Sequence, residues 1–281
     1  MQSKIGKAFA PAHISGIFII DIKKDPSLSG SMGCGICLED GAVTEVRPSK
    51  ETIIRINGTV MKAPTTLSAI GLLTPEPVFV DTTLNIPIGA GFGASGAGAL
   101  SASLSLNEAL SLDLTFKEVA GAAHRAEVMN MTGLGDVTGM TFGGMVIRKK
   151  AGAPFRGIID KIPSRNTKIS WIEFNEISTR SILSDELKQK TINRAGKSRL
   201  KELFKKPTIE NFMIQSAAFA KDIELMSPKV KDAIEAVKAA GGLASQAMLG
   251  DTVFAINDNG ALMEFGEIHE SRISNAGAHL I

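Results

Sequence analysis

Ser95, Glu127 and Asp136 lie in segments whose composition suits chemistry on a phosphate. Ser95 belongs to the glycine-rich stretch Pro87 to Ala97, between a strand-like run and an alanine- and leucine-rich helical run. Small residues let backbone N–H groups approach an anion, and a helix N-terminus favours negative charge. Glu127 lies on an alanine- and methionine-rich segment, where burial of a carboxylate requires a partner such as a cation. Asp136 follows glycines in a predicted loop, a common position for a catalytic carboxylate.

Other interpretations of these segments compete with this one. Taken alone, Asp136 and Glu127 are equally compatible with a capping aspartate and an exposed glutamate. Gly91 to Gly96 matches the dinucleotide fingerprint G-x-G-x-x-G, but the acidic residue expected about 20 residues further on is missing, so we disfavour NAD. Gly196-Lys197-Ser198 resembles the end of a P-loop, yet residue 191 is threonine instead of glycine. That basic segment predicts a solvated helix face, or alternatively a flank that attracts a phosphorylated ligand.

Composition restricts the class of protein. The chain has 281 residues and a net charge of +2, which gives no argument for a nucleic-acid or membrane partner. No apolar run approaches the roughly 20 residues that span a bilayer, so we expect a cytoplasmic protein. The two cysteines, Cys34 and Cys37, lie in an alternating strand-like segment, which favours two reduced thiols over a redox pair or a zinc site.

Periodicity and turn residues predict a mixed α and β chain in two domains, with a boundary within residues 151–170. Strands are expected at 8–20, 33–38, 42–46, 52–56, 78–86, 143–148, 171–177, 248–256 and 261–268, with a hairpin turn at Asp40-Gly41. Helices are expected at 63–73, 97–112, 115–131, 183–204, 208–225 and 227–240. Thr115 with Glu118 predicts a capping box, and Ser227 with Pro228 predicts a helix start.

Three motifs in this order resemble those of the GHMP kinases. The first is Ala10-Pro11-Ala12-His13, near the N-terminus. The second is Pro87 to Ala97, which matches P-x-x-x-G-L-G-S-S-A with Phe92 for leucine and Ala94 for the first serine. The third is the C-terminal loop Gly241 to Asp251, which is poorer in glycine than the family norm.

Within that family the chain resembles the archaeal-type pantoate kinases. Three segments carry this resemblance, together with Gly143-Gly144 and Met248-Leu249-Gly250: Ala10 to Gly16, Gly30 to Gly35, and Ala126-Glu127 leading to Thr132 to Val137. The resemblance implies ATP-dependent phosphorylation of the 4-hydroxyl of (R)-pantoate in coenzyme A biosynthesis. It also implies a two-domain α+β GHMP kinase fold, with the active site between the domains. Residues 1–155 would form the ribosomal-protein-S5-domain-2-like ATP-binding domain, and residues 156–281 the ferredoxin-like α/β-plait domain.

The resemblance also implies roles for individual residues. Ser95 and Glu127 match the residues that hold Mg²⁺ on the nucleotide, and Asp136 matches the aspartate that orients and deprotonates the attacking hydroxyl. The residues that would wrap the triphosphate of ATP are Pro87, Gly89, Gly91, Gly93, Ala94, Ser95, Gly96 and Ala97. Ser31, His124 and Arg148 fall where this branch binds pantoate, with Arg148 at its carboxylate.

One departure from the family pattern concerns chemistry directly. His13 stands where several family members carry lysine, so a substrate-binding lysine is absent there. Two alternatives stay open: a GHMP kinase for another small hydroxy acid, of the homoserine or mevalonate type, or a non-catalytic nucleotide-binding protein. A homodimer also stays open, because the sequence does not determine the oligomeric state.

Overall fold

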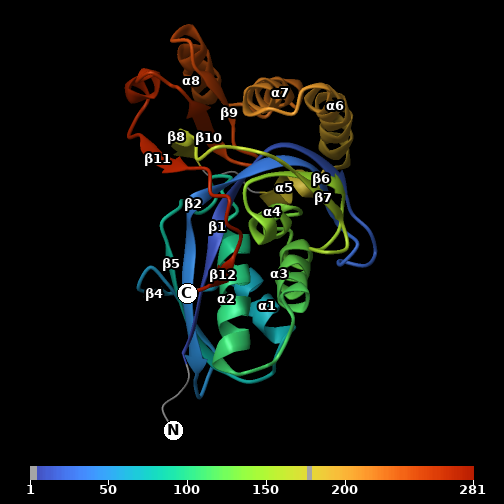
Figure 1. Ribbon diagram of the computed structural model, residues 1–281, viewed down its shortest axis with the longest axis vertical. Helices are drawn as coiled ribbons and strands as arrows, with labels where there is room; N and C mark the ends of the chain where they lie inside the picture. The colour runs from blue at the N-terminus through green and yellow to red at the C-terminus, as the bar shows by residue number, and fades with distance from the viewer. Residues whose placement is uncertain (1–4, 176–178) are drawn as a thin grey trace.

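The computed structural model describes residues 5–175 and 179–281, which form two parts built on two sheets (Figure 1). Within these residues the larger sheet has eight strands, ordered β12-β1-β2-β5-β3-β4, with β6 paired to β2 and to β7. The pairs are antiparallel, except that β3 and β5 are parallel. The strands are β1 Gly6–Asp21, β2 Gly30–Pro48, β3 Ile53–Ile56, β4 Thr59–Val60, β5 Val78–Leu84, β6 Met145–Lys150, β7 Ile158–Ile162 and β12 His279–Leu280.

Helices α1 to α4 lie together on one side of this sheet (Figure 1). Their bounds are α1 Pro64–Gly71, α2 Ala94–Ala109, α3 Phe116–Asn130 and α4 Asp136–Phe142. Helix α2 packs against β1, β2, α1 and α3, so it is buried on almost every side. This explains why its sequence is alanine, serine, glycine and leucine without a polar face. Helix α3 begins with the expected capping box, in which Thr115 and Glu118 exchange hydrogen bonds.

The second part contains a four-stranded antiparallel sheet, ordered β11-β8-β10-β9. Its strands are β8 Lys168–Asn175, β9 Leu243–Gln246, β10 Asp251–Ile256 and β11 His269–Arg272. The helices that follow the first part are α5 Thr179–Leu183, α6 Glu186–Lys205, α7 Ile209–Asp222, α8 Pro228–Ala239 and the 3₁₀ helix η1 Ala261–Glu264. In the described ranges, the helices are all too short or too polar to cross a membrane.

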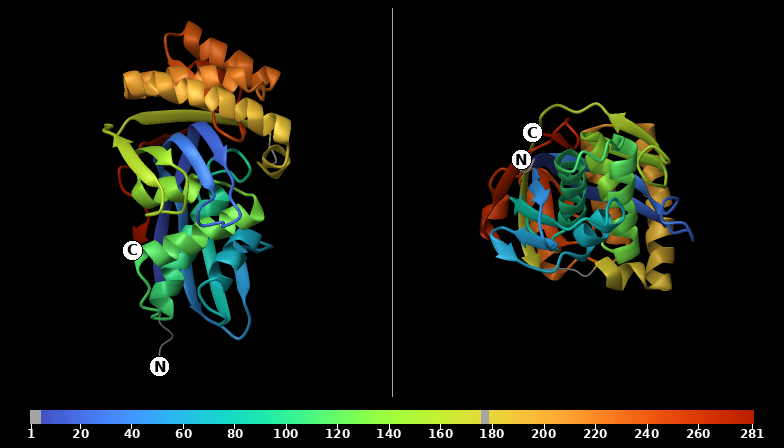
Figure 2. Two further views of the ribbon diagram at one scale, coloured as in Figure 1. Left: turned by 90° about the vertical axis from the view of Figure 1, so that its right-hand side faces the viewer. Right: turned by 90° about the horizontal axis from the view of Figure 1, so that it is seen from below.

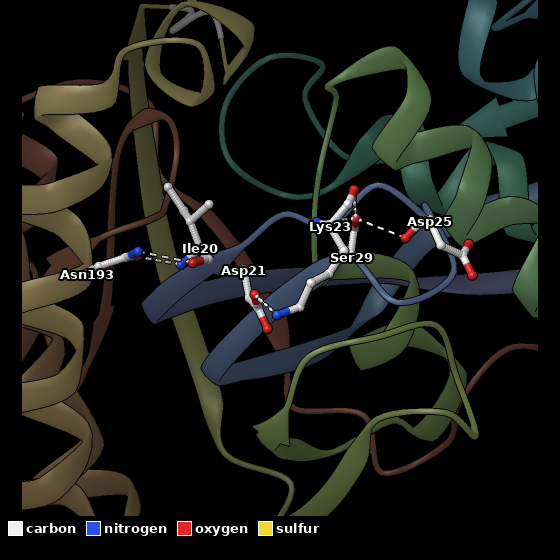
Figure 3. A network of polar contacts seen from close by, with 6 residues as sticks. All are labelled: Ile20, Asp21, Lys23, Asp25, Ser29 and Asn193. Atoms are coloured by element: carbon white, nitrogen blue, oxygen red, sulfur yellow. Dashed lines mark hydrogen bonds and ion pairs between the residues drawn. The ribbon is translucent and has the colours of Figure 1, made fainter.

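The two parts share one hydrophobic core, because α6 and α7 pack directly on β1 (Figure 2). Phe18 of β1 meets Phe219 of α7 edge to face, with ring centroids 5.5 Å apart. Asn193 of α6 holds the end of β1: its amide oxygen accepts from Ile20 N at 2.6 Å, and its amide nitrogen donates to Ile20 O at 3.0 Å (Figure 3). The second part is therefore fixed over one end of the first sheet.

The chain crosses between the parts more than once. β7, at 158–162, pairs with β6 in the first sheet, although it lies beyond the expected boundary at residue 155. β12 returns from the C-terminus to pair with β1 (Figure 1). The division into 1–155 and 156–281 stays a prediction, and the first sheet includes strands from both ranges.

Most predicted elements are confirmed with shifted ends, but one predicted turn and one predicted strand are wrong. Strand β2 runs straight through Asp40-Gly41, where a hairpin was expected, because Gly41 pairs with Pro11 in the β1–β2 register. A Cβ on Gly41 would lie 2.1 Å from Ala10 O, so this glycine permits close strand contact and does not form a turn. The strand expected at 261–268 is the 3₁₀ helix η1, which follows Gly260 at φ 82°. Of the strand expected at 171–177, residues 176 and 177 lie outside the described residues.

Candidate active site

The glycine-rich stretch forms the turn between β5 and α2. Gly91 and Gly93 have φ angles of 89° and 66°, which only glycine adopts readily. Helix α2 begins at Ala94 without a side-chain cap, so its first amides are available to an anion. Ser95, in the first turn, is exposed and lines a cleft of about 280 Å³. The glycine-rich stretch therefore presents the uncapped start of α2 beside the cleft, and its binding of phosphate stays a prediction.

The C-terminal loop completes this side of the cleft. A Cβ on Gly250 would lie 2.1 Å from Ala90 O, so this loop is in direct backbone contact with the glycine-rich stretch Pro87 to Ala97, which we call the phosphate loop. Met248 and Leu249 of the same loop line the cleft. Met248 N also donates to Ser15 O of β1 at 3.0 Å. His13 N of the first motif donates to Phe92 O of the second at 3.1 Å, so the three sequence motifs meet at one place.

Glu127 and Asp136 converge behind the phosphate loop, at Gly133. A Cβ on Gly133 would lie 2.3 Å from Glu127 Oε1 and 2.7 Å from Asp136 Oδ2, so the glycine makes room for both carboxylates. Glu127 is fully buried, and within the described residues its Oε1 has no hydrogen-bond partner. Burial and the nearby Asp136 raise the pKa of Glu127 well above its usual value. Such an unsatisfied carboxylate fits a site that a cation completes.

Asp136 opens helix α4, so the loop expected at this residue is corrected to a helix start. Its side chain is 17% exposed and faces the cleft, which it lines. Asp136 Oδ1 lies 2.7 Å from His13 Nδ1. On the other side of the same imidazole, His13 Nε2 lies 3.1 Å from Arg148 Nη1. Arg148 Nη2 donates to Ser15 Oγ, also at 3.1 Å.

Ser31 and Arg148 both lie against Gly135, where a Cβ would be 2.3 Å from Ser31 Oγ, but Arg148 is not among the residues that line the cleft. Ser31 lines the cleft and is 4% exposed. Arg148 is 1% exposed and lies directly beneath Gly135, where a Cβ would be 2.7 Å from its Nε. That Nε has no partner among the residues that the structure describes. Burial lowers the pKa of Arg148, while the nearby Asp136 opposes this shift.

His124 lies beneath the loop between β1 and β2, and it is not among the residues that line the cleft. Its Nε2 donates to Ser29 O at 2.9 Å, and burial lowers the pKa of its imidazole. Ser29 closes the loop, because its hydroxyl accepts from Lys23 N at 2.8 Å and lies 3.1 Å from Asp25 O (Figure 3). The position of His124 supports the strand that leads to Ser31. Direct contact of His124 with a substrate stays a prediction.

Sequence reasoning missed one cation of the cleft. Arg180 of α5 lines the cleft. Among the lining residues that the structure describes, Arg180 and Asp136 are the two that carry a charge. Arg180 Nη2 donates to the carbonyl of Asn130, at the end of α3, at 3.0 Å. No motif marks Arg180, because it belongs to the short helix α5, most of which precedes the helix expected at 183–204.

Comparisons with known proteins agree with this geometry. Residues 59–144 match the model of the GHMP kinases N terminal domain. A pantoate kinase of Methanocaldococcus jannaschii is 34% identical over 255 residues, covering 89% of this chain and 92% of the relative. A pantoate kinase of Methanospirillum hungatei is 31% identical over 285 residues, covering 98% and 96%.

Solved structures show the same fold over the whole chain. A phosphotransferase related to the CoA biosynthesis pathway has a TM-score of 0.90 at 26% identity, covering 99% of this chain and 98% of that one. A homoserine kinase from Cytophaga hutchinsonii has a TM-score of 0.70 at 16% identity, covering 100% and 98%. The α+β GHMP kinase fold expected from the motifs is confirmed. The chain belongs to the GHMP kinases and, within them, to the family of the archaeal pantoate kinases.

Proposed function

We propose that this chain transfers the γ-phosphoryl group of ATP to the 4-hydroxyl of (R)-pantoate, giving ADP and (R)-4-phosphopantoate for coenzyme A biosynthesis. The names of its relatives support this substrate. The observation that carries the proposal is that Ser95 and Asp136 line one cleft beside the N-terminus of α2, with the buried carboxylate of Glu127 next to Asp136 at Gly133. Phosphoryl transfer depends on positioning and charge neutralisation, and these groups supply both.

The nucleotide would occupy the end of the cleft near Ser95. The glycines of the turn allow phosphate oxygens to approach the α2 amides, and Arg180 adds a positive charge. A further cavity of about 120 Å³ shares Ser95 and Thr132 with the cleft and continues past Pro64 to Met61. Its lining is mostly apolar side chains and threonines, which suits the face of a nucleoside base.

Ser95 and Glu127 would hold Mg²⁺ together with phosphate oxygens and water. Mg²⁺ takes hard oxygen ligands and keeps several waters, so one hydroxyl and one carboxylate suffice from the protein. The unpartnered Oε1 of Glu127 fits this role. When bound, the ion would neutralise charge on the phosphates. We expect Mg²⁺ together with ADP to raise the Tm of the protein, and EDTA to remove the Mg²⁺-dependent part of this increase. In Glu127→Gln, that Mg²⁺-dependent part should be absent. An equal rise in the variant would contradict this assignment.

The substrate would lie between Asp136 and Ser31. Its carboxylate would rest at the end of the cleft where Ser31 is available and where the charge of Arg148 lies just beneath Gly135. Its hydroxyl would face Asp136, which accepts the proton as the oxygen bonds to phosphorus and the bond to ADP breaks. We further propose that the enzyme is cytoplasmic. That it forms a homodimer is a separate prediction, which light scattering tests.

A panel assay tests the proposal. The protein is incubated with ATP, Mg²⁺ and either pantoate, pantothenate, homoserine or mevalonate, and ADP release is measured. We expect pantoate to be the preferred acceptor, and Asp136→Asn to lower kcat by about 1,000-fold while nucleotide still binds. Fast turnover of another acid without turnover of pantoate would overturn the substrate assignment. No turnover of any acceptor would favour a non-catalytic nucleotide-binding protein.

A further inference from the structure

His13 contacts two ionised side chains and is completely buried. Its Nδ1 lies 2.7 Å from Asp136 Oδ1, and its Nε2 lies 3.1 Å from Arg148 Nη1. Since the side chain is not exposed to the cleft, His13 does not touch a bound substrate. It can act only through Asp136, the residue that would receive the proton of the substrate hydroxyl.

The chemistry of arginine determines which ring nitrogen of His13 carries the proton. A guanidinium has only N–H donors and no acceptor, so His13 Nε2 must accept from Arg148. A proton on Nε2, in either the other neutral tautomer or the imidazolium, would place two N–H groups against each other. The remaining nitrogen, Nδ1, therefore bears the hydrogen and donates it to Asp136 Oδ1. Burial also lowers the pKa of His13, so the neutral ring is favoured.

The surrounding backbone holds the imidazole in this orientation. A Cβ on Gly35 would lie 2.4 Å from His13 Nε2, and a Cβ on Gly139 would lie 2.4 Å from His13 Cδ2. Glycines on two sides thus leave room for the ring and little freedom to turn it. The main-chain nitrogen of His13 donates to Phe92 O at 3.1 Å, which connects this residue to the phosphate loop.

From these contacts we propose that His13 is a positioning residue: as the neutral Nδ1–H tautomer set by Arg148, it holds Oδ1 of Asp136 and leaves Oδ2 to the substrate hydroxyl. This inference rests on the proposed function for the identity of the substrate, but the tautomer itself does not depend on it. The hydroxyl proton passes to Asp136, and His13 keeps its own proton throughout. A side chain that donates from the same place can therefore replace it.

The tautomer is measured directly by long-range ¹H–¹⁵N correlation NMR on protein labelled at histidine. The signals of His13 are assigned by their loss in His13→Asn. We expect the shift of a protonated nitrogen at Nδ1 and of an unprotonated nitrogen at Nε2, the reverse of the tautomer that free histidine prefers. A proton on Nε2, or on both nitrogens, at neutral pH would overturn the proposal. This readout requires no turnover, so it fails independently of the substrate assignment.

Kinetics then separate positioning from simple structural support. We expect His13→Ala to lower kcat by about 100-fold, with KM for both substrates changed less than about threefold. His13→Asn, whose amide N–H can replace Nδ1–H, should recover most of that loss. The exposed His279→Asn is the matched control and should behave as wild type. Equal loss in His13→Ala and His13→Asn, or a change confined to KM, would show that His13 does not act by donating to Asp136.

Discussion

Arg180 donates a hydrogen bond from Nη2 to the carbonyl of Asn130, 3.0 Å away, and so joins α5 of the second part to the end of α3 in the first. Arg180 lines the cleft, and within residues 5–175 and 179–281 no hydrogen-bond partner of its other guanidinium N–H groups is found. A triphosphate entering there carries several negative charges, and a charge-assisted hydrogen bond is stronger than a neutral one. Arg180 is therefore well placed to bind ATP.

We expect Arg180→Ala to raise KM for ATP at least about tenfold, because a hydrogen bond to a charged group is lost. Arg180→Lys should have a KM for ATP between those of Arg180→Ala and wild type, since lysine keeps the positive charge but lacks the paired N–H donors of a guanidinium. Initial rates at varied ATP measure this, with Arg194→Ala on the exposed surface of α6 as the control. An unchanged KM for ATP alongside a raised KM for pantoate would assign Arg180 to the acceptor instead.

Gly139 tests the packing around His13 without altering a polar group. We expect Gly139→Ala to displace the imidazole and to cost about 1–3 kcal/mol of unfolding free energy, as overpacking in a core does. The kcat of Gly139→Ala should also be lower than that of wild type. Gly121→Ala in α3 is the matched control, because a Cβ there meets no atom within 4 Å. Urea denaturation and kcat measure both variants. A fully active and stable Gly139→Ala protein would show that the imidazole tolerates displacement.

Local sequence patterns predicted the parts of the site that a short segment defines. The glycines before Ser95 require positive φ at a helix start, and Thr115 with Glu118 forms a capping box from four residues. The chain of contacts from Arg148 through His13 to Asp136 joins strands β6 and β1 to α4, over a separation of 135 and 123 residues. No local pattern contains that information. From the sequence alone, His13 in place of the family's lysine therefore indicated only the loss of a substrate-binding lysine.

Where local patterns failed, a tertiary contact overrode them. Asp40-Gly41 is a strong turn signal, but Asn85 Oδ1 accepts from Gly41 N at 2.7 Å and β1 pairs alongside, so the strand continues. The apolar residues of 261–268 suggested a strand. Asp258 Oδ2 accepts from Gly260 N at 3.1 Å and so favours a turn at that point, which the 3₁₀ helix η1 follows.

His124 makes the stability of the protein depend on pH. Burial lowers the pKa of its imidazole below the value of 6.5 that it has in the unfolded chain. As the pH falls below 6.5, the unfolded state binds the proton first, so the free energy of unfolding decreases. Urea denaturation between pH 7.5 and pH 5.5 should show a smaller decrease for His124→Gln than for wild type. Equal decreases would contradict a lowered pKa.

The same variant tests the expected contact between His124 and the substrate. If the imidazole only supports the loop that carries Ser29, KM for pantoate should stay within about threefold of wild type at neutral pH. A rise of tenfold or more would show that His124 takes part in substrate binding.

Cys34 and Cys37 should not react with thiol reagents in the folded protein. Both are buried, and burial raises the pKa of each thiol to about 12, so almost no thiolate exists at neutral pH. We expect no labelling by a disulfide reagent at pH 7.5 over the time in which both react in urea. Rapid labelling of the native protein would contradict the burial of this pair.

The position of the new phosphate tests the central claim most directly. Pantoate has a primary hydroxyl on C4 and a secondary hydroxyl on C2, and both could in principle accept a phosphoryl group. We predict that the ³¹P signal of the product is split by the two protons of the C4 methylene. Splitting by the single proton of C2, or the absence of any phosphate ester when pantoate is supplied with ATP and Mg²⁺, would contradict the account.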